Sequence, residues 1–325
     1  MTARHLAGLA ALALVVTACS SSTDTPTSEP SASATLDTSV SPLTGLRQGS
    51  PPHNPVFMVK IENTAGGQPQ YGVNQADFVV EELVEGGVTR LATFFYSRLP
   101  TKLGHVRSAR TTDVGLAEPL DATLVASGGA PKTLRKIKRS ELPFFSYDKR
   151  SPGWSSDPSK HAPYHVLWDL QKLNATVQPA IPPKPYFTWG KGPGSTSTTK
   201  KTTSVSVTFS PATTTTWSLR GNKWARSPER AAGGQAYTAD TLVAIIAPVE
   251  DAGYRDPAGN AVPETVIEGS GRAVIFTGNS ATEAIWHKEN RNATMSFTSK
   301  AGKAITLRPG HAWLEAVPRG GSITY

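Results

Sequence analysis

Two arginines, Arg107 and Arg110, flank Ser108 in the stretch LGHVRSAR over 103–110, which contains no acidic residue. A guanidinium group holds a carboxylate or a phosphate through two parallel hydrogen bonds. Together with Arg90, these residues are candidate ligands for an anionic group. Backbone N–H groups at the start of the following predicted helix would complete the site. The residue types therefore predict binding of an anion.

Carboxylates upstream compete for the same arginines. The stretch 77–85 contains no basic residue and carries four acidic ones, Asp77, Glu81, Glu82 and Glu85. An isolated surface ion pair contributes at most about 1 kcal/mol, whereas a buried network can fix the register of a fold. Both interpretations stay open, because an acidic residue can orient an arginine that also binds a ligand. Glu81 and Glu85 are therefore candidate site residues as well.

Further polar residues are candidates for the wall of such a site. Asn63 and His165 are two of them, and SGGAP over 127–131 is a loop in which backbone can approach a ligand closely. The basic segment 131–141 is either a solvated helix face or a contact for anionic headgroups or polymer. These features predict where a ligand would bind, not which ligand.

Several enzyme classes are disfavoured by the residues present. Cys19 is the single cysteine, and its predicted lipidation leaves no thiol for cysteine catalysis or a Cys-ligated zinc. His161 and His165 have the spacing of a helical zinc site, but Pro163 between them opposes the helix. Neither a G-x-S-x-G elbow nor a phosphate-binding P-loop occurs. No catalytic residue, metal site or cofactor is predicted.

The N-terminus predicts the compartment. Residues 1–18 have the layout of a secretory signal peptide, with Arg4 before an apolar run that is shorter than the roughly 20 residues of a membrane span. VTAC, ending at Cys19, resembles the bacterial lipobox, in which the cysteine receives diacylglyceryl and fatty-acyl groups such as palmitate. We therefore expect a lipid anchor on the extracytoplasmic face of a bacterial membrane.

The net charge limits the classes of partner that are expected. With 33 Lys and Arg against 25 Asp and Glu, the chain carries a formal charge of +8, which favours anionic partners. Outside the cytoplasm these are an anionic cell-wall polymer or lipid headgroups, and nucleic acid is excluded as an expected partner.

Composition divides the remainder of the chain. A Ser, Thr and Pro-rich tether is expected over 19–41 and a second linker over 178–204. An α/β domain is predicted over 42–177, with strands at 56–63, 76–83, 90–97 and 122–127 and helices at 111–120, 131–141 and 163–173. A mainly antiparallel β domain is predicted over 205–325, including a hairpin that turns at Gly221–Asn222. The expected fold class is α+β.

Six strings along the chain resemble the YerB-like family of bacterial lipoproteins. They are GVNQADFVVEELVEGGVTRL (72–91), GHVRSAR (104–110), SGGAP (127–131), HAPYHV (161–166), IWHK (285–288) and LRPGHAWLEAVP (307–318). The resemblance implies an N-terminal and a C-terminal domain of unknown function, and it assigns no chemistry. This chain has His105 where the family usually has proline, and Tyr164 where a histidine is expected.

Three functions fit these observations. The first is an envelope lipoprotein without catalytic activity that binds an anionic ligand through its first domain. The second is an enzyme that acts on the phosphoryl group of a lipid-linked glycopolymer. The third is an accessory subunit of a membrane protein complex, which docks through the β domain. The orientation of Arg90, Arg107 and Arg110, toward a cleft or toward carboxylates, distinguishes a ligand site from a structural network.

Overall fold

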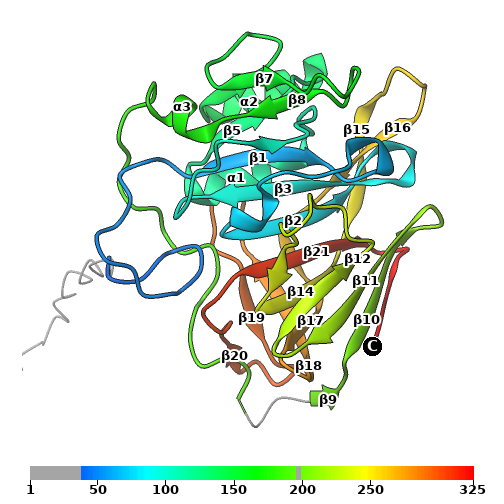
Figure 1. The fold of residues 1–325 in the computed structure, drawn as a ribbon. Coiled ribbons are helices and arrows are strands. Elements are labelled where there is room, and N and C mark those ends of the chain that lie inside the picture. The colour runs from blue at the N-terminus through cyan, green and yellow to red at the C-terminus, as the bar shows by residue number, and fades with distance from the viewer. Residues whose placement is uncertain (1–37, 195–198) are drawn as a thin grey trace, which may run out of the picture. The chain divides into compact units, whose positions relative to one another are not determined.

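The computed structural model describes residues 38–194 and 199–325 (Figure 1). The predicted signal peptide over 1–18, Cys19 and the predicted tether up to residue 37 lie outside these ranges. Strands dominate the described residues, and none of their helices is long and apolar enough to cross a membrane.

A mixed sheet of twelve strands runs through both predicted domains. The N-terminal region supplies five of its strands: β1 (Phe57–Glu62), β2 (Phe78–Leu83), β3 (Thr89–Phe95), β5 (Thr123–Ala126) and β6 (Phe144–Ser146). The C-terminal region supplies seven: β9 (Thr199–Lys201), β14 (Thr241–Ala247), β17 (Gly269–Thr277), β18 (Ser280–Lys288), β19 (Ser296–Thr298), β20 (Ala304–Ile305) and β21 (Ala312–Pro318). Strands β1, β5 and β6 pair in parallel, whereas β3 is antiparallel to both of its neighbours.

Strand β21 joins the two regions. It lies parallel to β14 on one side and to β2 on the other, with Leu314 in register with Val243 and Val80. All seven residues of β21 are buried. The predicted α+β class holds in this coarse sense, but the N-terminal strands belong to a shared mixed sheet and do not form a separate α/β layer.

A second, antiparallel sheet packs on the C-terminal part of the first (Figure 1). Its strands, in sheet order, are β13 (Thr238–Ala239), β12 (Lys223–Ser227), β11 (Thr213–Arg220), β10 (Ser204–Ser210) and β22 (Ser322–Thr324). The predicted hairpin turn at Gly221–Asn222 is confirmed between β11 and β12, and Gly221 has a φ of 62° there. Trp217 packs edge-on against Trp313 of β21, with 5.1 Å between ring centroids. Aromatic packing thus joins the two sheets.

Three short α-helices cover the N-terminal region: α1 (Thr112–Ala117), α2 (Pro131–Ser140) and α3 (Leu170–Asn174). Helix α2 buries Thr133 and Ile137 and exposes basic side chains on its other faces. The first two helices confirm predicted segments.

The prediction of a single helix over 163–173 is wrong. Residues Val166–Trp168 form strand β8, which pairs with β4 (Leu103–Gly104) and β7 (Trp154–Ser156), and α3 starts only after it. The apolar residues that suggested helical spacing are the buried residues of this strand and the buried side of a one-turn helix. Asp169 caps α3, because its carboxylate accepts a hydrogen bond from the Lys172 backbone N–H at 3.0 Å.

A hairpin from the C-terminal region reaches the N-terminal helices. Strands β15 (Val249–Arg255) and β16 (Ala261–Thr265) form it, and Figure 1 shows it beside the N-terminal strands. The Tyr254 hydroxyl lies 2.8 Å from the Thr133 hydroxyl of α2, and Glu264 pairs with Lys136. The predicted linker also enters the core: Tyr186 and Phe187 are fully buried, and both pack on Phe78.

Candidate functional site

The carboxyl ends of β1 and β2 and the start of β3 bring charged residues together. Arg90 of β3 is in register with Glu62 of β1 and with Glu82 of β2. Because successive side chains of a strand point to opposite faces, the neighbouring residues Glu81 and Glu82 contact different groups of side chains.

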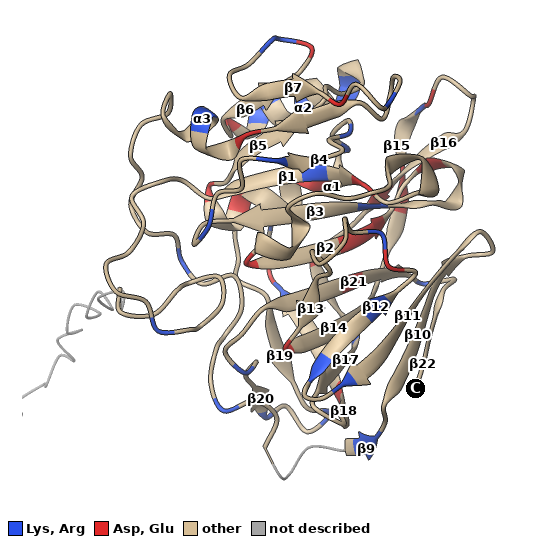
Figure 2. Ribbon diagram, viewed as in Figure 1, with Lys and Arg blue, Asp and Glu red and all other residues tan. Residues whose placement is uncertain are grey.

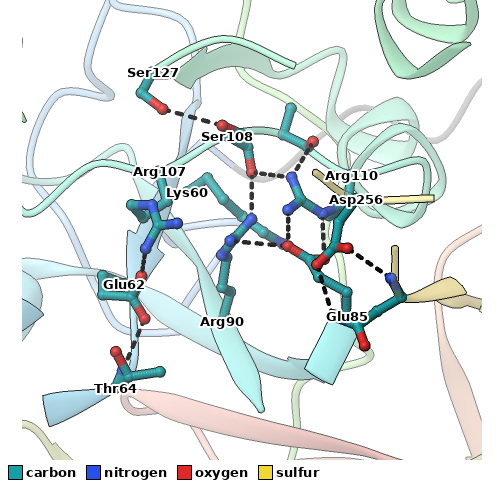
Figure 3. Close-up of polar contacts among 12 residues, drawn as sticks. Lys60, Glu62, Thr64, Glu85, Arg90, Arg107, Ser108, Arg110, Ser127 and Asp256 are labelled. Carbon is teal, nitrogen blue, oxygen red and sulfur yellow. Dashed lines mark hydrogen bonds and ion pairs between the residues drawn. The ribbon is translucent and has the colours of Figure 1, made fainter. Parts of the chain in front are cut away.

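Glu85 is the centre of the first cluster (Figure 3). Arg110 donates from Nε to one carboxylate oxygen at 2.7 Å and also pairs with the other oxygen. Arg90 donates to Glu85 at 3.2 Å, and each arginine donates to the Ser108 carbonyl at 3.2 Å. The structure thus brings together four of the predicted site residues, with both guanidinium groups directed at one carboxylate.

These contacts change the pKa values of Glu85 and Arg90. Burial by itself raises the pKa of Glu85, but the hydrogen bond from Arg110 and the charge of Arg90 lower it to about 2. Burial, followed by repulsion from Arg110, lowers the pKa of Arg90 to about 10. Glu85 is therefore an ionised acceptor at neutral pH and not a proton donor.

Arg107 has a different partner. Its guanidinium pairs with Glu62, and it lies over the Tyr164 ring at 5.0 Å from the centroid. The Nε of Arg107 is buried without a hydrogen-bond partner, and its side chain stays 14% exposed. Ser108 Oγ lies 3.3 Å from Ser127 Oγ (Figure 3). Within LGHVRSAR, Arg107 and Ser108 are half-buried and the other residues are buried.

Sequence reasoning missed Lys60 and Asp113. Lys60 pairs with Glu82, and its Nζ lies 2.7 Å from Asp113, which also accepts the backbone N–H of Arg110 at 2.7 Å. Burial raises the pKa of Glu82 to about 7, although the charge of Lys60 acts to lower it. The available signal was a lysine in the middle of the apolar run VFMVKIEN, where an unpaired charge would be costly.

Glu81 is the centre of a second cluster. Its carboxylate accepts hydrogen bonds from Asn63 at 3.0 Å and from the Thr89 hydroxyl at 2.7 Å. Two residues of the C-terminal region also donate to the Glu81 carboxylate. The Thr215 hydroxyl does so at 2.9 Å, and Arg226 does so from two nitrogens at 3.0 and 3.3 Å. Asn63 and Glu81 therefore lie together, in a group separate from Glu85.

Glu315 lies beside Glu81 in the next strand, because the two residues are in register across β2 and β21. Burial, followed by the charge of Glu81, raises the pKa of Glu315 well above its ordinary value. Trp217 donates to one oxygen of Glu315 at 2.6 Å. The raised pKa favours the protonated form of the Glu315 carboxyl, which lies next to the Glu81 carboxylate across the two strands.

Two family models match the chain. The N-terminal domain of a protein of unknown function (DUF3048) matches residues 43–181, and the corresponding C-terminal domain matches residues 205–314. The chain belongs to this family.

The similar proteins support the fold, and their names state no activity. The chain is 35% identical to "Putative lipoprotein YerB" of Bacillus subtilis (strain 168) over 124 residues, which is 37% of each protein. The crystal structure of YerB from Bacillus subtilis matches with a TM-score of 0.74 and 19% identity, over 88% of this chain and 99% of that one. The resemblance to the YerB-like family is thus confirmed, and the fold is shared.

The two clusters have different places relative to the DUF3048 domains. The Glu85 cluster lies within the N-terminal domain. The Glu81 cluster joins the domains, because Asn63 and Thr89 come from the first and Thr215 and Arg226 from the second.

His165 belongs to neither cluster. Its Nε2 lies 3.4 Å from the Tyr147 hydroxyl, and the two rings meet edge to face. Among the residues that the structure describes, no group of three or more His, Cys, Asp or Glu side chains has the arrangement to hold a metal ion.

A basic groove lies beside α2 of the N-terminal DUF3048 domain, and the C-terminal domain contributes Glu264 and Arg291 to its lining. Its volume is about 530 Å³, and Figure 2 shows the Lys and Arg positions along the helix. The residues that line it are Thr111, Lys132, Arg135, Lys136, Arg139, Glu264 and Arg291. We call this feature the α2 groove.

Proposed function

We propose that this protein is a lipoprotein, anchored through Cys19 at the extracytoplasmic face of the membrane, that binds an anionic polymer of the cell envelope through the α2 groove. The lipobox-like sequence and the name of the Bacillus subtilis relative support the anchor. The charge of the groove supports the ligand.

The observation that carries the proposal is the surplus of cations along one helix face. Residues 132, 135, 136 and 139 recur at the spacing of neighbouring helical turns. Glu264 pairs with Lys136, and Arg291 pairs with Glu118 at 3.4 Å. Lys132, Arg135 and Arg139 are exposed and form no ion pair with any residue in 38–194 or 199–325.

A row of exposed cations is complementary to a polymer with an anion on each repeat. Exposed single charges bind weakly, but several that engage together add their contributions. The Glu85 cluster supports the groove in this proposal, because Arg90 and Arg110 fix the segment that leads into Thr111 at the groove wall. Arg107 and Ser108 remain candidates for direct contact with the same ligand.

Retention of the purified full chain on immobilised polyglycerol phosphate tests this function. Lys132→Glu, Arg135→Glu and Arg139→Glu combined should weaken retention at least tenfold, since each cation near an anionic surface contributes about 1 kcal/mol. A matched control reverses three exposed cations elsewhere, Lys184, Lys300 and Arg319.

The control removes the same total charge and should leave retention within about twofold of the wild type, because the row on α2 is intact. Equal losses in the two variants would show that net charge alone drives binding and would overturn the proposal. Stronger retention on phosphatidylglycerol vesicles than on polyglycerol phosphate would assign the groove to lipid headgroups.

A further inference from the structure

A second cavity, of about 240 Å³, lies where the two DUF3048 domains meet. One wall comes from the end of β1 and the start of β3, and the other from the start of β11, from β12 and from the segment after it. Its polar lining includes Asn63, Thr89, Thr213, Thr215, Arg226 and Arg230. We call it the domain cavity.

The Glu81 cluster lies against this cavity, and its charges are balanced. Asn63, Thr89, Thr215 and Arg226 line the cavity and all donate to the Glu81 carboxylate. The Glu81 carboxylate compensates the positive charge of Arg226, and the hydrogen bonds between them are charge-assisted. Neighbouring Glu315 is not in the lining of the cavity, and burial, followed by the charge of Glu81, raises its pKa well above the ordinary value.

Arg230 is the one charge of the lining that this network leaves uncompensated. Its guanidinium forms no ion pair with any described residue, and its Nε is buried without a hydrogen-bond partner. Burial, followed by the positive charge of Arg226, lowers the pKa of Arg230. Its backbone is held in place, because the Arg230 carbonyl accepts the Gln70 N–H at 2.6 Å.

An unpaired guanidinium in a half-buried wall is costly, whereas a fork of N–H donors matches an oxyanion. We propose that the domain cavity binds one small oxyanion group, a carboxylate or a phosphate, through the guanidinium of Arg230 with Arg226 beside it. This site goes beyond the proposed polymer binding: it shares no residue with the α2 groove and carries a single uncompensated charge.

The size of the cavity limits the ligand. Sites for drug-sized ligands have volumes of roughly 300–1,000 Å³. A cavity of about 240 Å³ therefore accepts a small anion or the charged end of a larger molecule. A neutral sugar of similar size would leave the Arg230 donors without a charged partner.

Titration of the full chain with inorganic phosphate and, separately, with acetate tests the site. The arginine Nε–H resonances are followed by NMR in the wild type, in Arg230→Ala and in Arg220→Ala, an exposed arginine of β11. We expect saturable shifts with at least one of the two anions. The apparent affinity should fall at least tenfold in Arg230→Ala and stay unchanged in Arg220→Ala. Arg230→Lys should bind more weakly than the wild type, because it keeps the charge and loses the fork.

Three results would overturn the proposal: no saturable shift with either anion, equal affinity in Arg230→Ala, or saturable binding of N-acetylglucosamine in place of the anions. Loss of fold does not confuse the test, because the Arg230 side chain has no partner among the described residues, and thermal unfolding of Arg230→Ala checks it directly. The charge reversals on α2 should leave this titration unchanged, so the two proposals fail independently.

Discussion

Glu85 shows how one carboxylate can pair with two arginines from different segments, Arg90 of β3 and Arg110 of LGHVRSAR. Arg90 and Arg110 are buried, and each would be costly without a counter-charge. Their convergence on Glu85 places the LGHVRSAR segment against β3 and leaves Arg107 to pair with Glu62. Whether an arginine is available to a ligand or is paired with a carboxylate therefore has to be judged for each arginine separately.

Replacing Glu85 by Gln should destabilise the fold in a pH-dependent way. The pKa of Glu85 falls from its ordinary value of 4.5 to about 2 in the folded protein, so its ionised form stabilises the fold above pH 4.5. This contribution is lost as the pH falls from 4.5 toward 2. Glu85→Gln should lower the free energy of unfolding by about 3 kcal/mol at neutral pH, because two buried arginines lose their partner.

Urea denaturation of both proteins at a series of pH values measures the difference, which should shrink below pH 4.5. Glu82 titrates with the opposite sign, since its raised pKa of about 7 makes the fold less stable as the pH rises from 4.5. Subtracting the variant from the wild type cancels that effect. Glu250→Gln, on an exposed part of β15, is the control and should change stability by less than about 0.5 kcal/mol. A difference that is constant with pH would contradict the assignment to Glu85.

At the scale of elements, the α2 groove depends on a brace from far along the chain. The β15–β16 hairpin contacts α2 through Tyr254 and Glu264, so the basic helix is held by a C-terminal segment. A short helix has little stability of its own and relies on such packing.

Tyr254→Phe should lower the free energy of unfolding by about 1 kcal/mol, because it removes the hydrogen bond to Thr133. A double-mutant cycle with Thr133→Val measures the coupling between the two hydroxyls. The double variant should lose no more stability than the larger of the two single losses. Fully additive losses would mean that the hydroxyls do not stabilise each other.

The elements also show what local sequence patterns can predict. Strand β1 lies within one residue of the predicted 56–63 at each end, because this segment has apolar and β-branched residues between turn-forming boundaries. The segment 163–173 was assigned wrongly, since its apolar spacing satisfies a helix equally well as a buried strand followed by one turn. Pairing with β4 and β7 decides between them, and no local pattern records that pairing.

For the candidate site too, the sequence predicted residues with nearby partners but not the partners that are distant in sequence. The acidic stretch 77–85 identified Glu81 and Glu85, and Asn63 was a candidate because it is a polar residue at the end of a predicted strand. Their partners within the N-terminal domain are close in sequence. Thr215 and Arg226 complete the Glu81 cluster from the second domain, more than a hundred residues away. Only the assembled fold brings those residues together.

At the scale of the whole molecule, the shared sheet makes the two DUF3048 domains depend on each other. Strand β21 fills the position between β14 and β2, and without it both neighbours would lose a full set of backbone hydrogen bonds. We therefore expect a single cooperative unfolding transition for residues of both domains.

Leu314→Ala in β21 tests this dependence. Leu314 is 1% exposed and in register with Val80 and Val243, so its truncation should cost about 3 kcal/mol. Hydrogen exchange measured by mass spectrometry should then accelerate in peptides from β1 and from β17 by the same factor, because both regions exchange through one global opening. Leu219→Ala, at a half-buried position of β11, is the control and should accelerate both by a smaller factor. Faster exchange in β17 with unchanged exchange in β1 would show that the C-terminal domain opens alone, and the cavity between the domains would then open with it.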